Sequence, residues 1–165
     1  DTQTFGLGAI DSLRENKNHR EISGALYASP FNKGALVNQL DVAVLSALEV
    51  DTNFNVNVIT GSDGYFRGAS GGHSDVAAGA EITIVALPSI RGRIPTIKEE
   101  VTTVVTPGQD VDIVVTDRGV CVNPKAEKLQ ADLQKIEGIE ILDIKDLQEQ
   151  VESLTAKPNP PEFKR

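Results

Sequence analysis

The amino-acid sequence has no methionine, no tryptophan and a single cysteine among its 165 residues. A lone cysteine excludes an internal disulfide and is typical of a reducing compartment. Because Cys121 lies between Val120 and Val122, we interpret it as a buried structural thiol rather than a nucleophile. No apolar run approaches the roughly 20 residues of a membrane-spanning helix, and no secretory signal pattern is visible. We therefore expect a soluble cytoplasmic protein with no membrane partner.

Basic residues are also scarce. Sixteen Lys and Arg residues stand against 24 Asp and Glu, which gives a formal net charge of −8. Nucleic acids and anionic membranes need a basic protein surface, so neither is expected as a partner. An anionic substrate would have to be held locally by a few arginines. With 39% hydrophobic residues, the chain is long enough for one domain with a sizeable core.

Motifs for metals and nucleotides are absent from the sequence. His19 and His73 are far apart, and neither has a second His or Cys at ligand spacing. No Walker, G-x-S-x-G or G-x-G-x-x-G pattern occurs. We therefore expect no metal site, and His19 is interpreted as part of an exposed polar connection.

Apolar runs alternate with helical or glycine-rich segments, and this alternation indicates an α/β domain. The run over residues 41–48 is continuously apolar, which is typical of a parallel-sheet strand covered on both faces. Pro107 and Gly108 predict a type II turn between two β-branched runs. The expected strands cover residues 22–28, 41–48, 53–59, 82–87, 101–105, 111–115 and 138–143, and the expected helices cover residues 32–40, 126–136 and 144–154.

The two ends of the chain bear on its domain organisation. It begins at Asp1 without a methionine and ends in a Pro-rich stretch over residues 157–165. Neighbouring prolines favour an extended path. We expect a single α/β domain over residues 1–156 and an extended tail over residues 157–165, as a fragment of a longer polypeptide.

The glycine-rich stretch over residues 68–75 is the most informative segment. Gly68, Gly71 and Gly72, with small neighbours, precede His73 and a helical run. A glycine backbone can approach a ligand closely and can adopt positive φ. Amide groups presented ahead of a helix suit a carbonyl oxygen that becomes negative during acyl transfer. A tight strand-to-helix turn without a ligand, capped by His73, explains the same pattern.

Three asparagines alternate with apolar residues over residues 53–59. Asn53, Asn55 and Asn57 point to one side if the segment is a strand. Three amides on one face are costly to bury unless they meet partners. They either hydrogen-bond a ligand or line a wet sheet edge.

Three arginines are candidate anion clamps, because guanidinium forks match carboxylate and phosphate geometry. They are Arg67, Arg91 and Arg93. The last two follow a predicted strand end, where α/β folds usually place ligands. Ordinary surface arginines remain the alternative.

As an ordered set, these segments resemble family I CoA-transferases, and within them the citrate-using branch that works in multi-subunit lyases. The resemblance is carried by ALEVDTNFNVNVITGSDG, GASGGHSDVAAGA and VDIVVTDRGV, and it extends from about Asp11 to the Pro-rich tail. It implies an open, mostly parallel sheet flanked by helices, forming the later part of the second of two duplicated domains.

The resemblance also implies a reaction and its partners. In such transferases, acetyl on the CoA-like prosthetic arm of an acyl carrier protein is replaced by citrate, giving citryl thioester and acetate. A separate lyase subunit then splits the citryl thioester. The resemblance therefore implies no covalently bound cofactor, a CoA or CoA-like arm as substrate, and an oligomeric complex.

Site residues follow from the resemblance position by position. Gly68, Ser70, Gly71 and Gly72 would approach the thioester and hold its oxyanion, with His73 beside the substrate. Asn55 and Asn57 would face the acyl pocket. Arg67, Arg91 and Arg93 are assigned to citrate carboxylates or to phosphates of the arm by their chemistry rather than by a motif.

One feature departs from the family pattern. Many family I enzymes form an acyl anhydride on a glutamate, and no such motif is visible here. Either that carboxylate lies outside this chain, or citrate and acetate form the mixed anhydride with each other.

Other functions are compatible with the same residues. They are an acyl-CoA hydrolase, another carboxylate CoA-transferase, or a non-catalytic assembly module. Because the family active site forms between two sheet domains, we expect the isolated chain to be inactive and to expose an apolar face.

Overall fold

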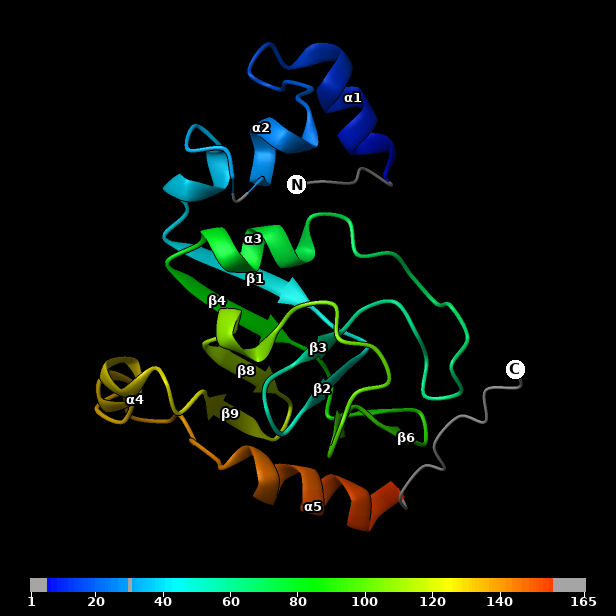
Figure 1. Ribbon diagram of the computed structural model, residues 1–165, viewed down its shortest axis with the longest axis vertical. Helices are drawn as coiled ribbons and strands as arrows, with labels where there is room; N and C mark the ends of the chain where they lie inside the picture. The colour runs from blue at the N-terminus through cyan, green and yellow to red at the C-terminus, as the bar shows by residue number, and fades with distance from the viewer. Residues whose placement is uncertain (1–5, 30, 156–165) are drawn as a thin grey trace.

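The computed structural model describes residues 6–29 and 31–155, so the expected Pro-rich tail lies outside the described residues. Figure 1 shows the arrangement of its elements. The helices are α1 (Leu7–Glu15), α2 (Gly24–Ala28), the 3-10 turns η1 (Leu36–Gln39) and η2 (Gly108–Asp110), α3 (His73–Gly79), α4 (Glu127–Leu133) and α5 (Ile144–Thr155). The strands are β1 (Val42–Ser46), β2 (Glu49–Asp51), β3 (Val56–Asn57), β4 (Ile82–Ala86), β5 (Ile90–Arg91), β6 (Ile94–Pro95), β7 (Ile97–Lys98), β8 (Ile113–Thr116) and β9 (Gly119–Val122).

The main sheet has the strand order β1-β4-β8-β9. β1 pairs in parallel with β4, and β4 with β8, while β9 closes the far edge as an antiparallel hairpin partner of β8. A smaller sheet, β3-β2-β7, lies beside it. The prediction of an α/β fold with an open, mostly parallel sheet flanked by helices is confirmed.

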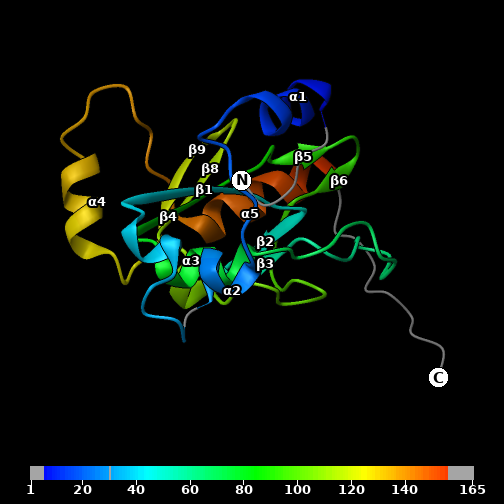
Figure 2. The ribbon, with the colours of Figure 1, turned by 90° about the horizontal axis from the view of Figure 1, so that it is seen from above.

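Helices cover the two faces of this arrangement. In Figure 1, α3 and the N-terminal helices lie above the main sheet, and α5 lies below the strands. Seen from above, α4 stands at one side of the molecule (Figure 2), and it buries no side chain. On the upper face, one apolar cluster joins the N-terminal segment, α3 and β1. Its buried residues are Ala28, Ala35, Val37, Ala43 and Val76. The larger cluster fills the space between the strands and α5.

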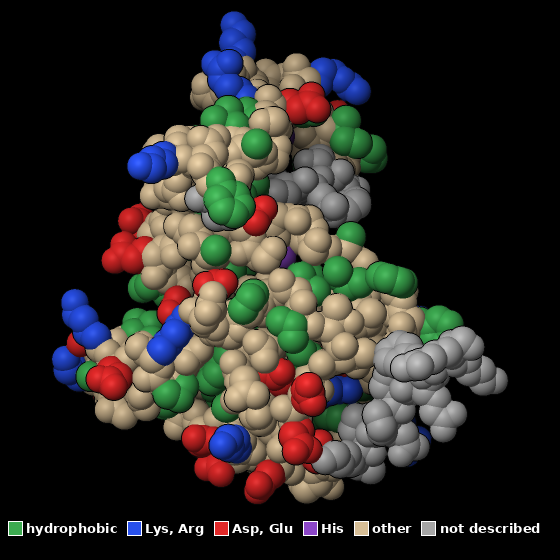
Figure 3. Space-filling view, in the orientation of Figure 1, with side chains coloured by type: hydrophobic (Ala, Val, Ile, Leu, Met, Phe, Trp, Pro, Cys, Tyr) green, Lys and Arg blue, Asp and Glu red, His purple; other side chains and the backbone are tan. Residues whose placement is uncertain are grey.

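The long helix α5 shows how sequence pattern and packing agree. Its buried apolar residues Ile144, Leu147 and Val151 recur at helical spacing and join the larger core. The Asp143 carboxylate accepts a hydrogen bond from the Lys145 amide at 2.7 Å, which satisfies a free N–H at the start of the helix. Acidic side chains gather over α5 on the outer surface (Figure 3). The predicted helix over residues 144–154 is confirmed.

Cys121 lies fully buried in β9, within the larger core. Burial, with a further contribution from the Asp143 charge, raises the pKa of the Cys121 thiol to about 12. A thiol with so high a pKa is a poor nucleophile, which confirms its interpretation as a structural residue.

Three expected strands do not form in the described residues, those over residues 22–28, 101–105 and 138–143. In place of the strand over residues 22–28 the chain forms α2 (Gly24–Ala28), which Ser23 caps with its Oγ accepting from the Leu26 amide at 3.2 Å. Residues 138–143 contribute only an isolated bridge, in which Ile141 pairs with Val120. The strand over residues 41–48 is present as β1, but it is not covered on both faces. As an edge strand it leaves Val44 68% exposed.

The segment around Pro107 also differs from the prediction. Residues 101–105 form no strand, and Gly108 opens η2 instead of taking the positive φ that a type II turn requires. Packing explains the difference, because Gly108 is pressed against the turn at Asn53. A Cβ added to Gly108 would lie only 1.9 Å from the Asn53 carbonyl oxygen.

We predict that Gly108→Ala lowers the free energy of unfolding by about 3 kcal/mol, the upper range for an overpacked core. The backbone of Asn53 cannot move aside as a flexible side chain would. Urea unfolding followed by circular dichroism measures the change. The control is Gly8→Ala in α1, where a Cβ meets nothing within 4 Å. Equal stability of both variants would contradict the close contact.

Candidate functional site

The turn over residues 51–55 settles where two of the three asparagines lie. Phe54 has a φ of 64°, so the chain reverses here instead of continuing as a strand. The Asp51 carboxylate accepts hydrogen bonds from the amides of Asn53 and Asn55 at 2.9 and 3.0 Å. The Asn55 side chain in turn accepts from the Gly108 amide at 2.9 Å. The prediction that the three asparagines share one strand face is therefore wrong.

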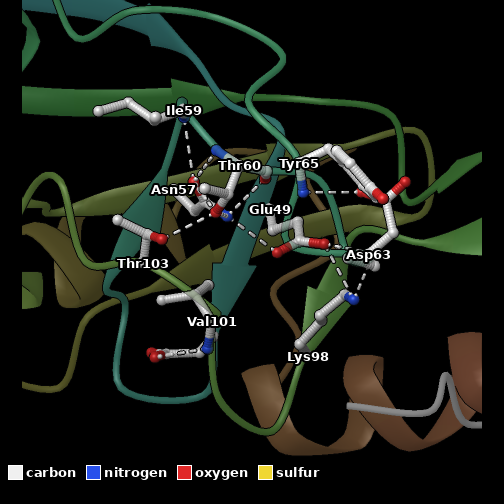
Figure 4. A network of polar contacts seen from close by, with 11 residues as sticks. Glu49, Asn57, Ile59, Thr60, Asp63, Tyr65, Lys98, Val101 and Thr103 are labelled. Atoms are coloured by element: carbon white, nitrogen blue, oxygen red, sulfur yellow. Dashed lines mark hydrogen bonds and ion pairs between the residues drawn. The ribbon is translucent and has the colours of Figure 1, made fainter. Parts of the chain in front are cut away.

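Asn57 belongs to a buried polar network centred on Glu49 (Figure 4). The Asn57 amide donates to Glu49 Oε2 at 3.0 Å and to the Thr60 carbonyl oxygen at 2.8 Å. Lys98 Nζ lies 2.9 Å from Glu49 Oε1, and the Ser62 hydroxyl donates to the same oxygen at 2.5 Å. Every buried side-chain donor and acceptor in the described residues has a partner, so this network is complete.

The network fixes the start of the long connection from β3 to α3, which loops out to one side in Figure 1. Beyond it, the amides of Arg67 and Gly68 donate to the Ile59 carbonyl oxygen at 2.7 and 3.2 Å. A Cβ at Gly68 would lie 2.7 Å from the Val58 carbonyl oxygen, so only glycine fits there. These hydrogen bonds fix both ends of the loop over residues 60–66, and they place Arg67 next to the glycine-rich segment.

We predict that Lys98→Met lowers the free energy of unfolding by about 3–5 kcal/mol, because it leaves the Glu49 carboxylate buried without its cation. Lys135→Met is the matched control, since the Lys135–Asp132 pair is largely exposed. Exposed pairs contribute at most about 1 kcal/mol. Chemical unfolding of both variants measures the difference. A small loss in Lys98→Met would show that water solvates Glu49.

The glycine-rich segment forms a sharp turn just ahead of α3. Gly71 has a φ of 51°, in the region that favours glycine, and Gly72 follows with φ −93° and ψ 19°. Within the described residues, the amides of Gly71 and Gly72 have no hydrogen-bond partner. Consecutive amides with φ of opposite sign form a concave anion-binding turn. The turn can therefore receive an oxyanion.

His73 locks this turn to the rest of the fold. Its Nε2 lies 3.0 Å from the Ser46 carbonyl oxygen, and its Nδ1 lies 2.7 Å from Thr106 Oγ1. A carbonyl oxygen only accepts, so Nε2 carries the proton and Nδ1 accepts from the Thr106 hydroxyl. Burial lowers the pKa of His73, an effect opposed by the hydrogen bond to Ser46. The ring is therefore neutral and fully engaged, as a clamp rather than a free base.

We predict that the His73 clamp makes stability pH-dependent. The folded pKa lies below the ordinary value of 6.5, so the unfolded chain takes up the proton first as the pH falls. The contribution of neutral His73 to the free energy of unfolding is fully present above pH 6.5 and is lost as the pH falls toward the pKa of His73 in the folded protein. His73→Gln keeps a donor for Ser46 without titrating. Unfolding free energies at pH 7.5 and 5.5 should fall less in His73→Gln than in the parent protein, and an equal fall would contradict the assignment.

A cavity of about 560 Å³ opens at the carboxyl end of β1, between that strand end and the glycine turn. We call it the arginine cavity. Its walls include Val44 to Leu48, Gly68 to Ser70, Gly72 and His73. Among the described residues that line it, Arg67 and Arg91 are the charged ones, and none is an Asp or Glu. The cavity is therefore a local positive site in a chain of net charge −8.

The three candidate arginines are placed differently. Arg91 donates from its guanidinium to the Ala47 carbonyl oxygen at 3.1 Å, which orients it at the arginine cavity. Arg67 lines the same cavity and pairs with Asp63, a contact that helps to hold the pKa of Asp63 below its usual value after the larger effect of the Tyr65 amide. Arg93 lies in the exposed turn between β5 and β6 and is outside the cavity lining.

A second cavity, of about 530 Å³, lies on the other side of the glycine turn, and we call it the N-terminal cavity. It is lined by Gly71, Gly72, Asp75 and eight residues of the segment between Leu13 and Ala28, which are Leu13, His19, Arg20, Glu21, Ile22, Gly24, Tyr27 and Ala28. Gly72 and Tyr27 line both cavities. The glycine turn is therefore part of a shared wall.

The structure thus brings together six of the ten candidate residues at the arginine cavity: Arg67, Gly68, Ser70, Gly72, His73 and Arg91. Gly71 faces the N-terminal cavity. Asn55, Asn57 and Arg93 line neither, because the two amides are committed to internal hydrogen bonds. Sequence reasoning missed Tyr27 and Thr106. Tyr27 lies in a segment whose pattern predicts a strand that does not form, and no sequence signal links Thr106 to His73.

Two classes of site are not found in residues 6–29 and 31–155. No group of three or more His, Cys, Asp or Glu side chains is placed to hold a metal ion. No helix in this part of the chain is long and apolar enough to cross a membrane.

Comparison with known proteins gives a consistent result. The model of the family "Citrate lyase, alpha subunit (CitF)" matches residues 1–165. The citrate lyase alpha chain of Klebsiella pneumoniae is 55% identical over 163 residues, and that of Escherichia coli K12 is 52% identical over the same length. Each match covers 99% of this chain but only 32% of the relative, so the chain spans about a third of the relatives' length.

A solved structure shows the same fold. It is described as the alpha subunit of citrate lyase from Streptococcus mutans in complex with citrate, and it matches with a TM-score of 0.88 and 48% identity. The match covers 93% of this chain and 30% of that protein.

Proposed function

This chain belongs to the citrate lyase alpha subunit family, and from that premise we propose that it supplies one wall of an acyl-transfer site that exchanges acetyl for citrate on a thioester. The observation that carries the proposal is the meeting of two elements at one place. An arginine cavity without acidic lining residues adjoins a glycine turn whose amides are unpaired within the described chain. The first element suits a polycarboxylate and the second an oxyanion.

The proposed reaction needs no proton transfer. A citrate carboxylate oxygen attacks the acetyl carbonyl carbon of the thioester, and the C–S bond breaks. The products of this step are a free thiolate and a citryl–acetyl anhydride. The thiolate then attacks the citryl carbonyl carbon, the anhydride C–O bond breaks, and acetate leaves. Both nucleophiles are already anions, so no general base is required. This fits a site whose histidine has both ring nitrogens engaged.

The residues take distinct roles in this scheme. The amides of Gly71 and Gly72 stabilise the tetrahedral oxyanion of each step, together with the close backbone approach at Gly68 and Ser70. Arg91, already oriented by Ala47, and Arg67 bind citrate carboxylates that do not react. If an enzyme carboxylate forms a covalent anhydride instead, it comes from outside the described lining of the arginine cavity, which contains none.

The relatives are about three times as long as this chain, so the activity is proposed for a subunit of their full length. We propose a cytoplasmic multi-subunit complex in which the thioester is carried on the CoA-like arm of a gamma (acyl carrier) subunit and the citryl product passes to a beta (lyase) subunit. The apolar residues of α1, of which Leu7 is 80% exposed, would pack on other parts of that assembly. The isolated chain is proposed to be inactive.

The test uses a subunit of the relatives' full length that carries this sequence, with acetyl-CoA as donor. We predict that acetate release depends on citrate and that Arg91→Gln raises the KM for citrate about 10- to 100-fold, the value of one hydrogen bond to a charged group. Arg93→Gln is the matched control and should leave the KM unchanged. Acetate release without an acceptor would indicate a hydrolase and overturn the proposal. Absence of release with any carboxylate would favour an assembly module.

A further inference from the structure

The N-terminal cavity is not explained by citrate binding alone. At about 530 Å³ it is nearly as large as the arginine cavity, and it lies within the usual range for small-molecule sites, roughly 300–1,000 Å³. It shares Gly72 and Tyr27 with the arginine cavity. Two cavities that meet at a proposed oxyanion turn suggest two parts of one substrate.

The geometry of a thioester fits this division. Its carbonyl carbon is trigonal planar, so the bond to the rest of the acyl group and the bond to sulfur point in different directions. Gly68 and Ser70 line only the arginine cavity, whereas Gly71 lines only the N-terminal cavity. A thioester held at Gly72 would therefore direct one substituent into each cavity.

Charge decides which substituent enters which cavity. The arginine cavity presents Arg67 and Arg91 without a lining carboxylate, so it suits the carboxylates of a citryl group. The N-terminal cavity presents Arg20 together with Glu21 and Asp75, so its acidic side chains outnumber its arginine. Placing a phosphate beside two carboxylates is unfavourable at short range.

The lining of the N-terminal cavity suits a neutral chain that bears amides. Leu13, Ile22 and Ala28 provide apolar contacts. The carboxylates of Glu21 and Asp75 can accept from amide N–H groups, and Arg20 can donate to amide carbonyl oxygens. The phosphates of a CoA-like arm would then lie beyond this cavity.

We propose that the N-terminal cavity binds the uncharged, amide-bearing arm of the acyl thioester, with the sulfur at Gly72 and the acyl group in the arginine cavity. This inference rests on the proposed function and names the binding place of its second substrate part. It makes residues 13–28 a substrate-binding segment rather than only a cover for α3.

The test measures binding of S-acetylpantetheine, which lacks every phosphate, and of acetyl-CoA to the full-length subunit by calorimetry. Ile22→Trp fills the N-terminal cavity, and Gly24→Leu adds a side chain where a Cβ meets nothing within 4 Å. Leu26→Trp is the control, since Leu26 is similarly exposed but lines neither cavity. We expect both filling variants to weaken both ligands by the same factor, about tenfold or more, with citrate affinity unchanged. Thermal melts verify folding, and Gly24→Leu remains informative if Ile22→Trp does not fold.

Three results would overturn the inference. The first is unchanged S-acetylpantetheine binding in folded Ile22→Trp or Gly24→Leu. The second is no binding of S-acetylpantetheine to the parent protein. The third is an Arg20→Gln variant that loses acetyl-CoA affinity while keeping S-acetylpantetheine affinity, because the cavity would then hold a phosphate. Failure of the proposed function gives a different result from failure of this inference. Citrate-dependent acetate release would then be absent, while the filling variants would still weaken binding of S-acetylpantetheine.

Discussion

The imidazole of His73 holds together three parts of the chain that are remote in sequence. Its Nε2–H reaches the Ser46 carbonyl oxygen at the end of β1, and its Nδ1 accepts from Thr106, whose backbone pairs with Val56 in β3. The ring begins α3, so these two hydrogen bonds set the position of the glycine turn relative to the main sheet. Both cavities depend on that position because the turn is their shared wall. His73, which the sequence places either as a cap of the turn or beside the substrate, therefore serves as a fixed neutral clamp.

The distribution of charge fits an enzyme that handles anions within an acidic protein. The net charge of −8 repels anions at long range, yet salt screens such effects beyond about 10 Å. The arginine cavity is lined by Arg67 and Arg91 and by no carboxylate, and the Asp63 partner of Arg67 lies outside the lining. A polycarboxylate is thus favoured there and disfavoured over α5, where acidic side chains gather (Figure 3). Local placement, rather than overall composition, determines where an anion can bind.

Periodicity and glycine content predict the elements of the fold that are determined by short segments of sequence. The strand at residues 82–87, the helix at 144–154 and the turn before α3 follow from periodicity and glycine content. The asparagine segment differs from the predicted strand because Phe54 takes a positive φ and the Asp51 carboxylate accepts hydrogen bonds from the amides of the turn. Contacts such as Asn53 against Gly108 and Arg91 on Ala47 join distant segments, and no spacing rule reveals them. For the same reason, neither cavity could be outlined before the fold was known.

The cavity linings have an uneven origin along the chain. Every residue that lines either cavity lies between Leu13 and Arg91, whereas β8, β9, α4 and α5 contribute none. The later segments contribute to the larger core, and Thr106, which precedes them in the chain, contacts the glycine turn through its hydrogen bond to His73. Evolution can therefore alter the two halves of this chain under different pressures. Substitutions in α5 act on the packing of the core, whereas substitutions between Leu13 and Arg91 also change the shape and charge of the two cavities.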